Sequence, residues 1–96
     1  MSETAFYILF CLQEPQHGYG IGQEVKAMTK GEVSISPGTM YGILSKMEKD
    51  GLIRFVSEAE KRKIYEITEL GREILTTEMN RIKRIYINSI GDEYNG

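Results

Sequence analysis

Apolar residues follow the period of a helix up to residue 50, the period of a strand between residues 53 and 68, and the period of a helix again after residue 68. Residues 3–13 are apolar with Phe6 and Leu9 at helical spacing, and residues 19–29 repeat the pattern with Ile21 and Val25. In the third segment Met40, Leu44 and Met47 are spaced four and three apart, which predicts a buried stripe on a helix. The pattern thus predicts three successive helices.

Short sequence signals mark where these helices begin and end. Proline and glycine in Glu14–Gly18 interrupt the first helix, and Lys30-Gly31 ends the second. Ser36 is a good N-cap, and Pro37 suits the first helical position. Gly51 then stands where a helix commonly ends in the left-handed conformation.

The remaining residues predict a hairpin and one more helix. Strands are expected at Ile53–Ser57 and Lys63–Thr68, joined by the polar turn 58–62. Thr68 is a plausible cap for a last helix of roughly twenty residues. Along that helix an apolar stripe recurs at heptad-like spacing. Its members are Leu75, Met79, Ile82 and Tyr86.

Three helices followed by a hairpin is the element order of a winged helix-turn-helix, in which the third helix enters the major groove of DNA. The fold class is therefore mainly α with a small β-hairpin. We expect a winged helix-turn-helix over residues 1–68, and a C-terminal dimerisation helix with a short tail over residues 69–96.

Composition narrows the class of protein. The chain has 96 residues, enough for one domain, and its net charge of −2 means that DNA binding must rest on a local basic patch. The single Cys11 cannot form an internal disulfide, which favours a reducing cytoplasm, and no apolar run is long enough to span a membrane. No catalytic or cofactor motif is present, and one histidine with one cysteine predicts no metal site.

Candidate DNA-contacting residues lie on the outer side of the third helix and in the hairpin. Glycines there let the backbone approach a groove, hydroxyls and lysines can bond phosphates or bases, and the basic run Lys61–Lys63 would form the tip of a wing. The predicted DNA-binding residues are Ser36, Gly38, Thr39, Tyr41, Ser45, Lys46, Lys49, Lys61, Arg62 and Lys63. The alternative reading of the third helix is a helix cap followed by a solvated charged face.

The single histidine and the single cysteine are each expected to have a structural role. His17 is expected to cap or brace the turn before the second helix, with Tyr19 packed against it. Cys11 lies in an apolar helix and is expected in the core, the alternative being a redox sensor.

Four stretches together carry a family resemblance. HGYGI (17–21), SPGTMY (36–41), LSKMEKDGLI (44–53) and RKIYEITELG (62–71) resemble, in this order, the PadR family of bacterial transcriptional regulators. The resemblance implies a winged-helix repressor that dimerises through its C-terminal helix and binds a palindromic operator near a promoter. It also implies that a small aromatic effector is possible. The chain departs from the family pattern at Gly42, where PadR proteins usually have proline, and in having no tryptophan.

The apolar stripe of the last helix predicts a homodimer, with the outer side of the first helix as the second contact. The predicted interface consists of Phe6, Ile8, Leu75, Met79, Ile82 and Tyr86.

Two further functions remain open. The chain would be a protein-interaction module if the winged helix had lost DNA binding, and its net charge of −2 supports that reading. It would bind a small hydrophobic effector if a pocket formed between subunits, lined by Phe6, Ile8, Tyr86 or Met79.

Overall fold

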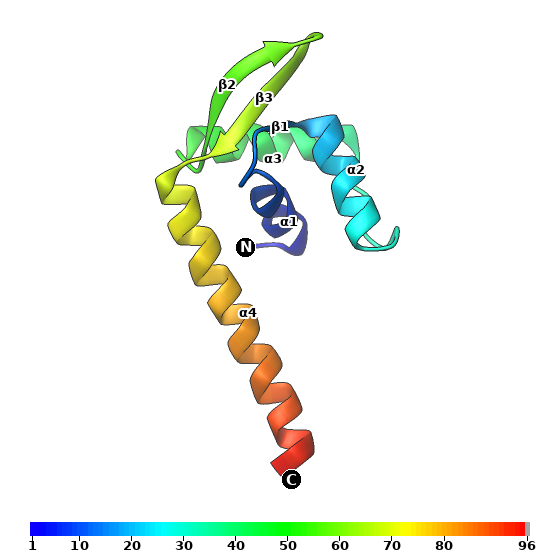
Figure 1. The fold of residues 1–96 in the computed structure, drawn as a ribbon, viewed down its shortest axis with the longest axis vertical. Helices are drawn as coiled ribbons and strands as arrows, with labels where there is room; N and C mark the ends of the chain where they lie inside the picture. The colour runs from blue at the N-terminus through cyan, green and yellow to red at the C-terminus, as the bar shows by residue number, and fades with distance from the viewer. Residues whose placement is uncertain (96) are drawn as a thin grey trace.

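A computed structural model of the chain describes residues 1–95, with side chains described through Gly91, and has four helices and a small sheet (Figure 1). Helices α1, α2 and α3 form the body, and the long helix α4 leads away from it. The chain is 55 Å long in its greatest extent and 19 Å in its least. In order, the elements are α1 (Glu3–Cys11), β1 (Gln16–His17), α2 (Gly18–Met28), α3 (Pro37–Lys49), β2 (Ile53–Ala59), β3 (Arg62–Ile67) and α4 (Glu69–Asn95).

The predicted helix boundaries are confirmed where a capping residue marked them. The Ser36 hydroxyl accepts a hydrogen bond from the Thr39 amide at 3.3 Å, and Pro37 is the first residue of α3. Gly51 has a φ of 78° just after the helix. Thr68 caps α4 by accepting from the Gly71 amide at 3.1 Å. Caps are read correctly from sequence because each satisfies specific free amides at a helix end.

The sheet has three antiparallel strands in the order β1-β3-β2, one more strand than the predicted hairpin. Gln16 pairs with Tyr65 and His17 with Ile64, so the segment predicted as a break forms a strand of two residues. The β2–β3 hairpin, called the wing below, is also longer than predicted. Its turn is reduced to Glu60 and Lys61, both with positive φ (52° and 63°).

The core lies where α1, α2, α3, the base of the wing and the first turns of α4 meet. The predicted inner residues of α2 and α3 are buried, and Cys11 is buried as predicted. Ile8 is predicted on the outer side of the first helix and in the dimer interface, but its side chain is fully buried in the core of one chain. The buried residues are Ile8, Leu9, Cys11, Leu12, Ile21, Val25, Met40, Leu44, Met47, Ile53, Tyr65, Ile67 and Leu75.

Helix α4 is 27 residues long rather than about twenty, and it continues through the region predicted as a tail. Gly96, the last residue of that predicted tail, lies outside the described residues. Leu75 is 2% exposed and belongs to the core, so its assignment to a dimer interface is wrong. Within residues 1–95, none of the helices combines the length and apolar composition that crossing a bilayer requires.

Candidate nucleic-acid interface

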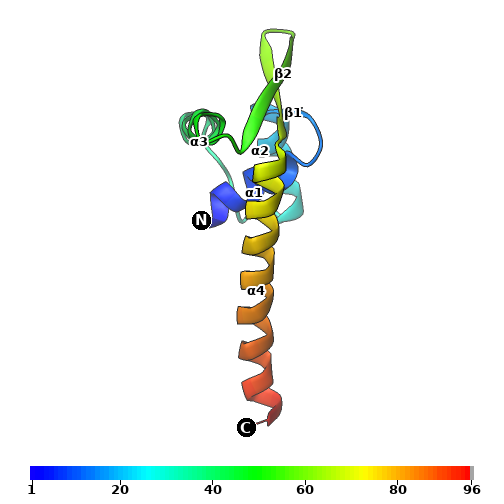
Figure 2. The same cartoon turned by 90° about the vertical axis from the view of Figure 1, so that its left-hand side faces the viewer.

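Helix α3 has a continuous exposed side opposite its buried Met40, Leu44 and Met47. Figure 2 looks along this helix, with the wing rising beside it. All the DNA-binding residues predicted on the third helix are exposed, and Tyr41 is at the edge of this side, next to α2. We call the set the reading face, and it consists of Ser36, Gly38, Thr39, Tyr41, Gly42, Ser45, Lys46 and Lys49.

Two glycines leave bare backbone on the reading face, Gly38 in the first turn of α3 and Gly42 in its interior. A Cβ atom added at Gly38 or at Gly42 would meet no atom within 4 Å. Neither glycine is therefore required by packing inside the protein, and glycine in a helix interior costs stability relative to alanine. Bare backbone on an exposed helix allows another molecule to approach closely, which matches the geometry that a groove-binding helix needs.

Hydroxyls and cations surround this bare backbone. The Ser36 and Thr39 hydroxyls are 3.0 Å apart at the start of the helix, and Ser45 follows farther along. Lys46 is 3.6 Å from the Asp50 carboxylate, an exposed pair one helical turn apart. Such exposed pairs contribute little stability, so Lys46 is readily available to an anion. The reading face thus combines hydrogen-bond donors with exposed positive charge.

Glu48 is exposed on α3 but lies toward the sheet. Burial and then the Glu48 carboxylate raise the pKa of Tyr65, a residue of β3. The acidic side chain is therefore near the base of the wing rather than in the row of Gly42 and Ser45. This arrangement keeps a negative charge away from the centre of the reading face.

The wing carries the second cluster of predicted contacts. Lys61, Arg62 and Lys63 are exposed at its end, and Lys61 lies in the two-residue turn. The Arg62 guanidinium lies over the Tyr19 ring of α2, 4.8 Å from the ring centroid. Sequence reasoning did not anticipate this contact, because it joins residues that are far apart in the chain.

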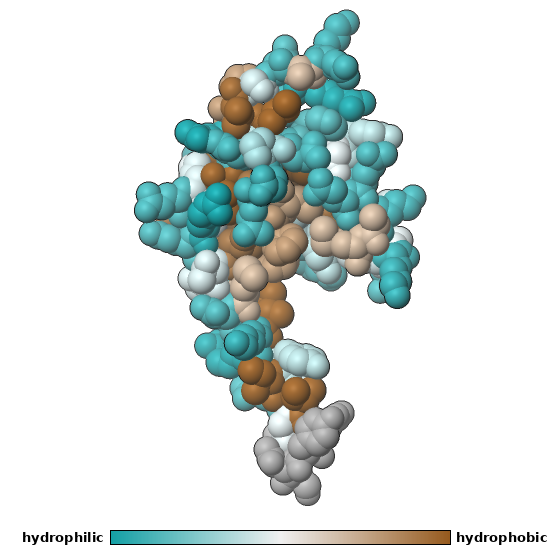
Figure 3. Space-filling model, in the orientation of Figure 1, coloured by the Kyte–Doolittle hydropathy of each residue, from teal (hydrophilic) through white to brown (hydrophobic). Residues whose placement is uncertain are grey.

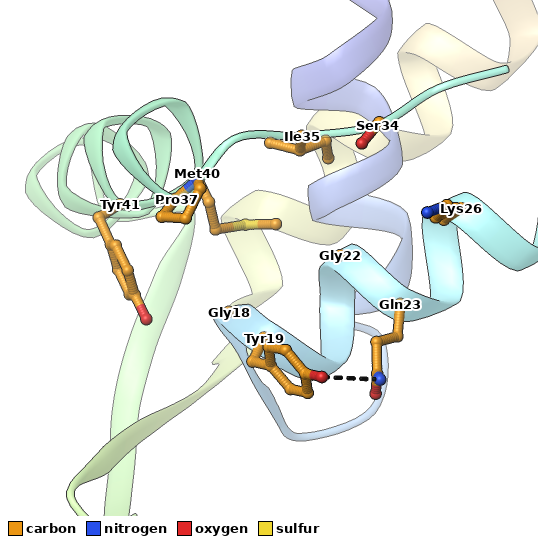
Figure 4. Close-up of a pocket in the computed structure, with 10 residues that line it drawn as sticks. All are labelled: Gly18, Tyr19, Gly22, Gln23, Lys26, Ser34, Ile35, Pro37, Met40 and Tyr41. Carbon is orange, nitrogen blue, oxygen red and sulfur yellow. Dashed lines mark hydrogen bonds between the residues drawn. The ribbon is translucent and has the colours of Figure 1, made fainter. Parts of the chain in front are cut away.

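An open cavity of about 400 Å³ separates α2 from the start of α3 (Figure 4). Tyr19, Gln23 and Lys26 line it from α2, at helical spacing on one side, and Tyr41 lines it from α3. Gly18 and Gly22 also line it from α2, and a Cβ at Gly18 would crowd Met40 at 3.1 Å, so the absence of a side chain there lets the two helices approach. Sequence analysis missed Gln23 and Lys26 as candidate site residues, although their i, i+4, i+7 spacing from Tyr19 placed all three on one face.

His17 has the predicted capping role. Its Nδ1 accepts a hydrogen bond from the Gly20 amide at 3.0 Å, which caps α2. Its ring stacks on Tyr19 with centroids 6.5 Å apart. Both residues therefore fix the start of α2 beside β3.

Cys11 is buried in the core, and burial followed by the nearby Glu24 carboxylate raises its thiol pKa to about 12. A thiol that keeps its proton is a poor nucleophile. The structure thus supports the core assignment of Cys11 over the redox sensor. Among the described residues, His, Cys, Asp and Glu side chains nowhere gather into a group that would hold a metal ion.

Helix α4 has a row of exposed apolar side chains beyond the core, and apolar surface is visible along it in Figure 3. Met79 and Ile82 are each 43% exposed, and Tyr86 is 63% exposed. Phe6 on α1 is partly buried against the core. Because Leu75 is in the core and Ile85 is exposed, the apolar stripe is redefined from here on as Met79, Ile82, Ile85 and Tyr86.

Most of the chain matches a known family of proteins. The profile of the Transcriptional regulator PadR-like family matches residues 8–77, from α1 through the wing into α4. The chain belongs to this family. The four motifs that suggested PadR from sequence all lie within the matched residues, so that recognition is confirmed.

A relative and two solved structures add to the comparison. The uncharacterized protein X of Lysinibacillus sphaericus is 35% identical over 69 residues, which are 68% of this chain and 63% of that protein, so the chain spans less than two thirds of it. A PadR-like transcriptional regulator from Bacillus cereus has a TM-score of 0.72 at 26% identity, with 97% of this chain and 92% of that one covered. Bacillus subtilis PadR, solved in complex with operator DNA, has a TM-score of 0.73 at 21% identity, with 92% and 60% covered. These structures confirm the predicted winged-helix fold.

Proposed function

We propose that this chain is a DNA-binding transcriptional regulator in which α3 enters the major groove. The observation that carries the proposal is the reading face, where Gly38 and Gly42 leave bare backbone in open space among hydroxyls and lysines. Bacillus subtilis PadR, which shares the fold, was solved with operator DNA. Family membership supports the same role.

The residues of the interface have different roles. Ser45, Lys46 and Lys49 reach base edges and phosphates along the groove, because they lie on the exposed side of α3. Lys61 and Lys63, at the end of the wing, contact phosphates beside the major groove. Lys26 lines the cavity next to the start of α3 and extends the basic surface onto α2.

We propose further that the protein acts as a homodimer through α4. The apolar stripe is largely exposed in one chain, and burying such side chains is worth about 1.5–3 kcal/mol each. Phe6 remains a proposed second contact from α1. A twofold axis would set the two α3 helices about 34–36 Å apart, one turn of DNA, and would require an inverted-repeat operator.

Regulation would follow from occupancy of the operator. A dimer on an inverted repeat near a promoter blocks access by polymerase, which makes repression the expected outcome. A flat hydrophobic or aromatic effector between subunits would loosen DNA binding, with Met79 and Tyr86 lining its site. Titrating aromatic compounds into the operator complex tests for such release.

Fluorescence anisotropy with a labelled duplex from the gene's own upstream region tests DNA binding. We expect binding that weakens steeply with salt, and each lost phosphate contact should lower the log–log salt slope by about 0.9. Lys49→Ala should weaken binding. Arg84→Ala, which removes a cation from the side of α4 away from the apolar stripe, is the matched control and should not.

The competing function is that of an interaction module without DNA binding, favoured by the net charge of −2. A folded protein that shows no binding to the upstream duplex at low salt would support that module and reject the regulator. Equal binding by Lys49→Ala and the parent would instead show that α3 is not the contacting helix.

A further inference from the structure

The pairing of β1 with β3 ends just before the residues that join the wing to α2. Gln16 faces Tyr65 and His17 faces Ile64 in the antiparallel pair. Tyr19 and Arg62 each lie two residues beyond the last pair, His17 with Ile64. The backbone has already entered α2 at Gly18, so no further strand pairing forms there, and the two side chains meet instead.

The contact between these side chains is a cation over an aromatic face. The Arg62 guanidinium carbon lies 4.8 Å from the centroid of the Tyr19 ring. His17 stacks on Tyr19 at 6.5 Å, with the ring planes inclined by 22°. The Tyr19 hydroxyl accepts a hydrogen bond from the Gln23 side chain at 3.1 Å (Figure 4). His17 and Gln23 therefore hold the Tyr19 ring in place independently of Arg62.

The outer part of the wing needs such support. The pairing of β2 with β3 is irregular between Phe55 and Ser57, so the hairpin beyond residue 57 is offset from its base. Among the hydrogen bonds, ion pairs and aromatic contacts found within residues 1–91, the Arg62–Tyr19 contact is the one that joins residues 57–63 to a helix. Without it, the wing end would be attached through the hairpin alone.

We propose that Arg62 is a positioning residue, which holds the wing against α2 through Tyr19 so that Lys61 and Lys63 meet the DNA backbone at a fixed distance from α3. This inference rests on the proposed function. It gives the three basic residues of the wing two different roles, because the lysines contact phosphate and the arginine sets the angle of the hairpin. Composition alone would assign all three to the phosphates.

The salt dependence of DNA binding distinguishes the two roles. Lys63→Ala removes a phosphate contact, so affinity should fall and the log–log salt slope should drop by about 0.9. Arg62→Ala should lower affinity by about two- to fivefold, the factor expected for an exposed cation–aromatic contact, with the slope unchanged. Tyr19→Leu should have the same effect, and the double variant should bind no more weakly than either single one. Tyr19→Phe keeps the ring and should bind like the parent.

A measurement on the free protein tests the contact without DNA. The heteronuclear NOE of backbone amides in residues 58–63 reports motion of the wing end on the picosecond-to-nanosecond timescale. It should fall in Arg62→Ala and Tyr19→Leu, and stay at the parental value in Lys63→Ala and Tyr19→Phe.

Two results would overturn the proposal. One is an unchanged NOE in Arg62→Ala, which would mean that the contact does not restrain the wing. The other is a slope reduced by about 0.9 in Arg62→Ala with effects additive to those of Tyr19→Leu, which would make Arg62 a phosphate contact. If the parent failed to bind DNA at all, the proposed function would fall, and the NOE comparison would still decide whether Arg62 holds the wing.

Discussion

Replacing Gly42 by alanine should make the protein more stable and a weaker DNA binder. Gly42 lies in the interior of α3, and a Cβ there meets no atom within 4 Å. Alanine in place of glycine in a helix interior is worth about 0.5–1 kcal/mol. For a domain of this size that corresponds to a rise in Tm of about 2–8 °C, measured by thermal denaturation at matched protein concentration.

The same methyl group would stand between α3 and the floor of the groove. If it moves the helix outward enough to lose one base contact, the loss is about 1–3 kcal/mol, or roughly 5- to 150-fold in affinity. Anisotropy titration of the operator duplex measures this loss. The combination of higher stability and weaker binding is informative, because a folding defect would lower both.

Gly71→Ala provides the stability control. A Cβ at Gly71 would overlap the Leu52 carbonyl oxygen and crowd the Ile67 side chain at 2.7 Å, so this variant should be destabilised. The reasoning about Gly42 would be refuted if Gly42→Ala bound the operator as tightly as the parent. It would also be refuted if Gly42→Ala were destabilised like Gly71→Ala.

Three further predictions use other parts of the molecule. Gly38→Glu should abolish operator binding in gel shifts and leave the circular dichroism spectrum unchanged, because a carboxylate in the first turn suits the helix dipole but repels phosphate. If this variant still bound the operator, α3 would not be the helix in the groove. Ile82→Glu should convert the dimer to a monomer in sedimentation, whereas Asn80→Glu, which makes the same change in charge on another side of α4, should remain a dimer. If both variants were dimers, the apolar stripe would not be the dimer interface. Since the folded chain raises the Cys11 pKa from 9.0 to about 12, the folded state keeps a proton that the unfolded state loses. The contribution of Cys11 to the free energy of unfolding should therefore be constant below pH 9 and fall as pH rises from 9 toward 12, and urea titrations of Cys11→Ala should lack that contribution.

Helix ends that are marked by a capping residue, a proline or a glycine could be predicted from the sequence. Ser36 caps the N-terminus of α3, Pro37 suits its first position and Gly51 adopts positive φ just after its C-terminus, so the predicted start of α3 is correct. The exposed side of α3 followed from three buried residues at helical spacing. The candidate site on that helix could therefore be derived before any tertiary contact was known.

Features that depend on tertiary contacts could not be predicted. Strand β1 has two residues, too few for a period, and exists because β3 pairs with it. Helix α1 is apolar on most sides, so its pattern did not show that Ile8 faces inward. The Arg62–Tyr19 contact required the sheet register. The wing turn was misjudged because Glu60 and Lys61 adopt positive φ without glycine or asparagine.

Binding of the purified protein to its own upstream duplex at low salt, with the stoichiometry measured by sedimentation, tests the central claim most directly. The account predicts two chains on one duplex that carries an inverted repeat with half-sites about one helical turn apart, and a complex that dissociates as salt rises. A folded protein that leaves this duplex unbound at low salt, or that binds it as a single chain, would contradict the account.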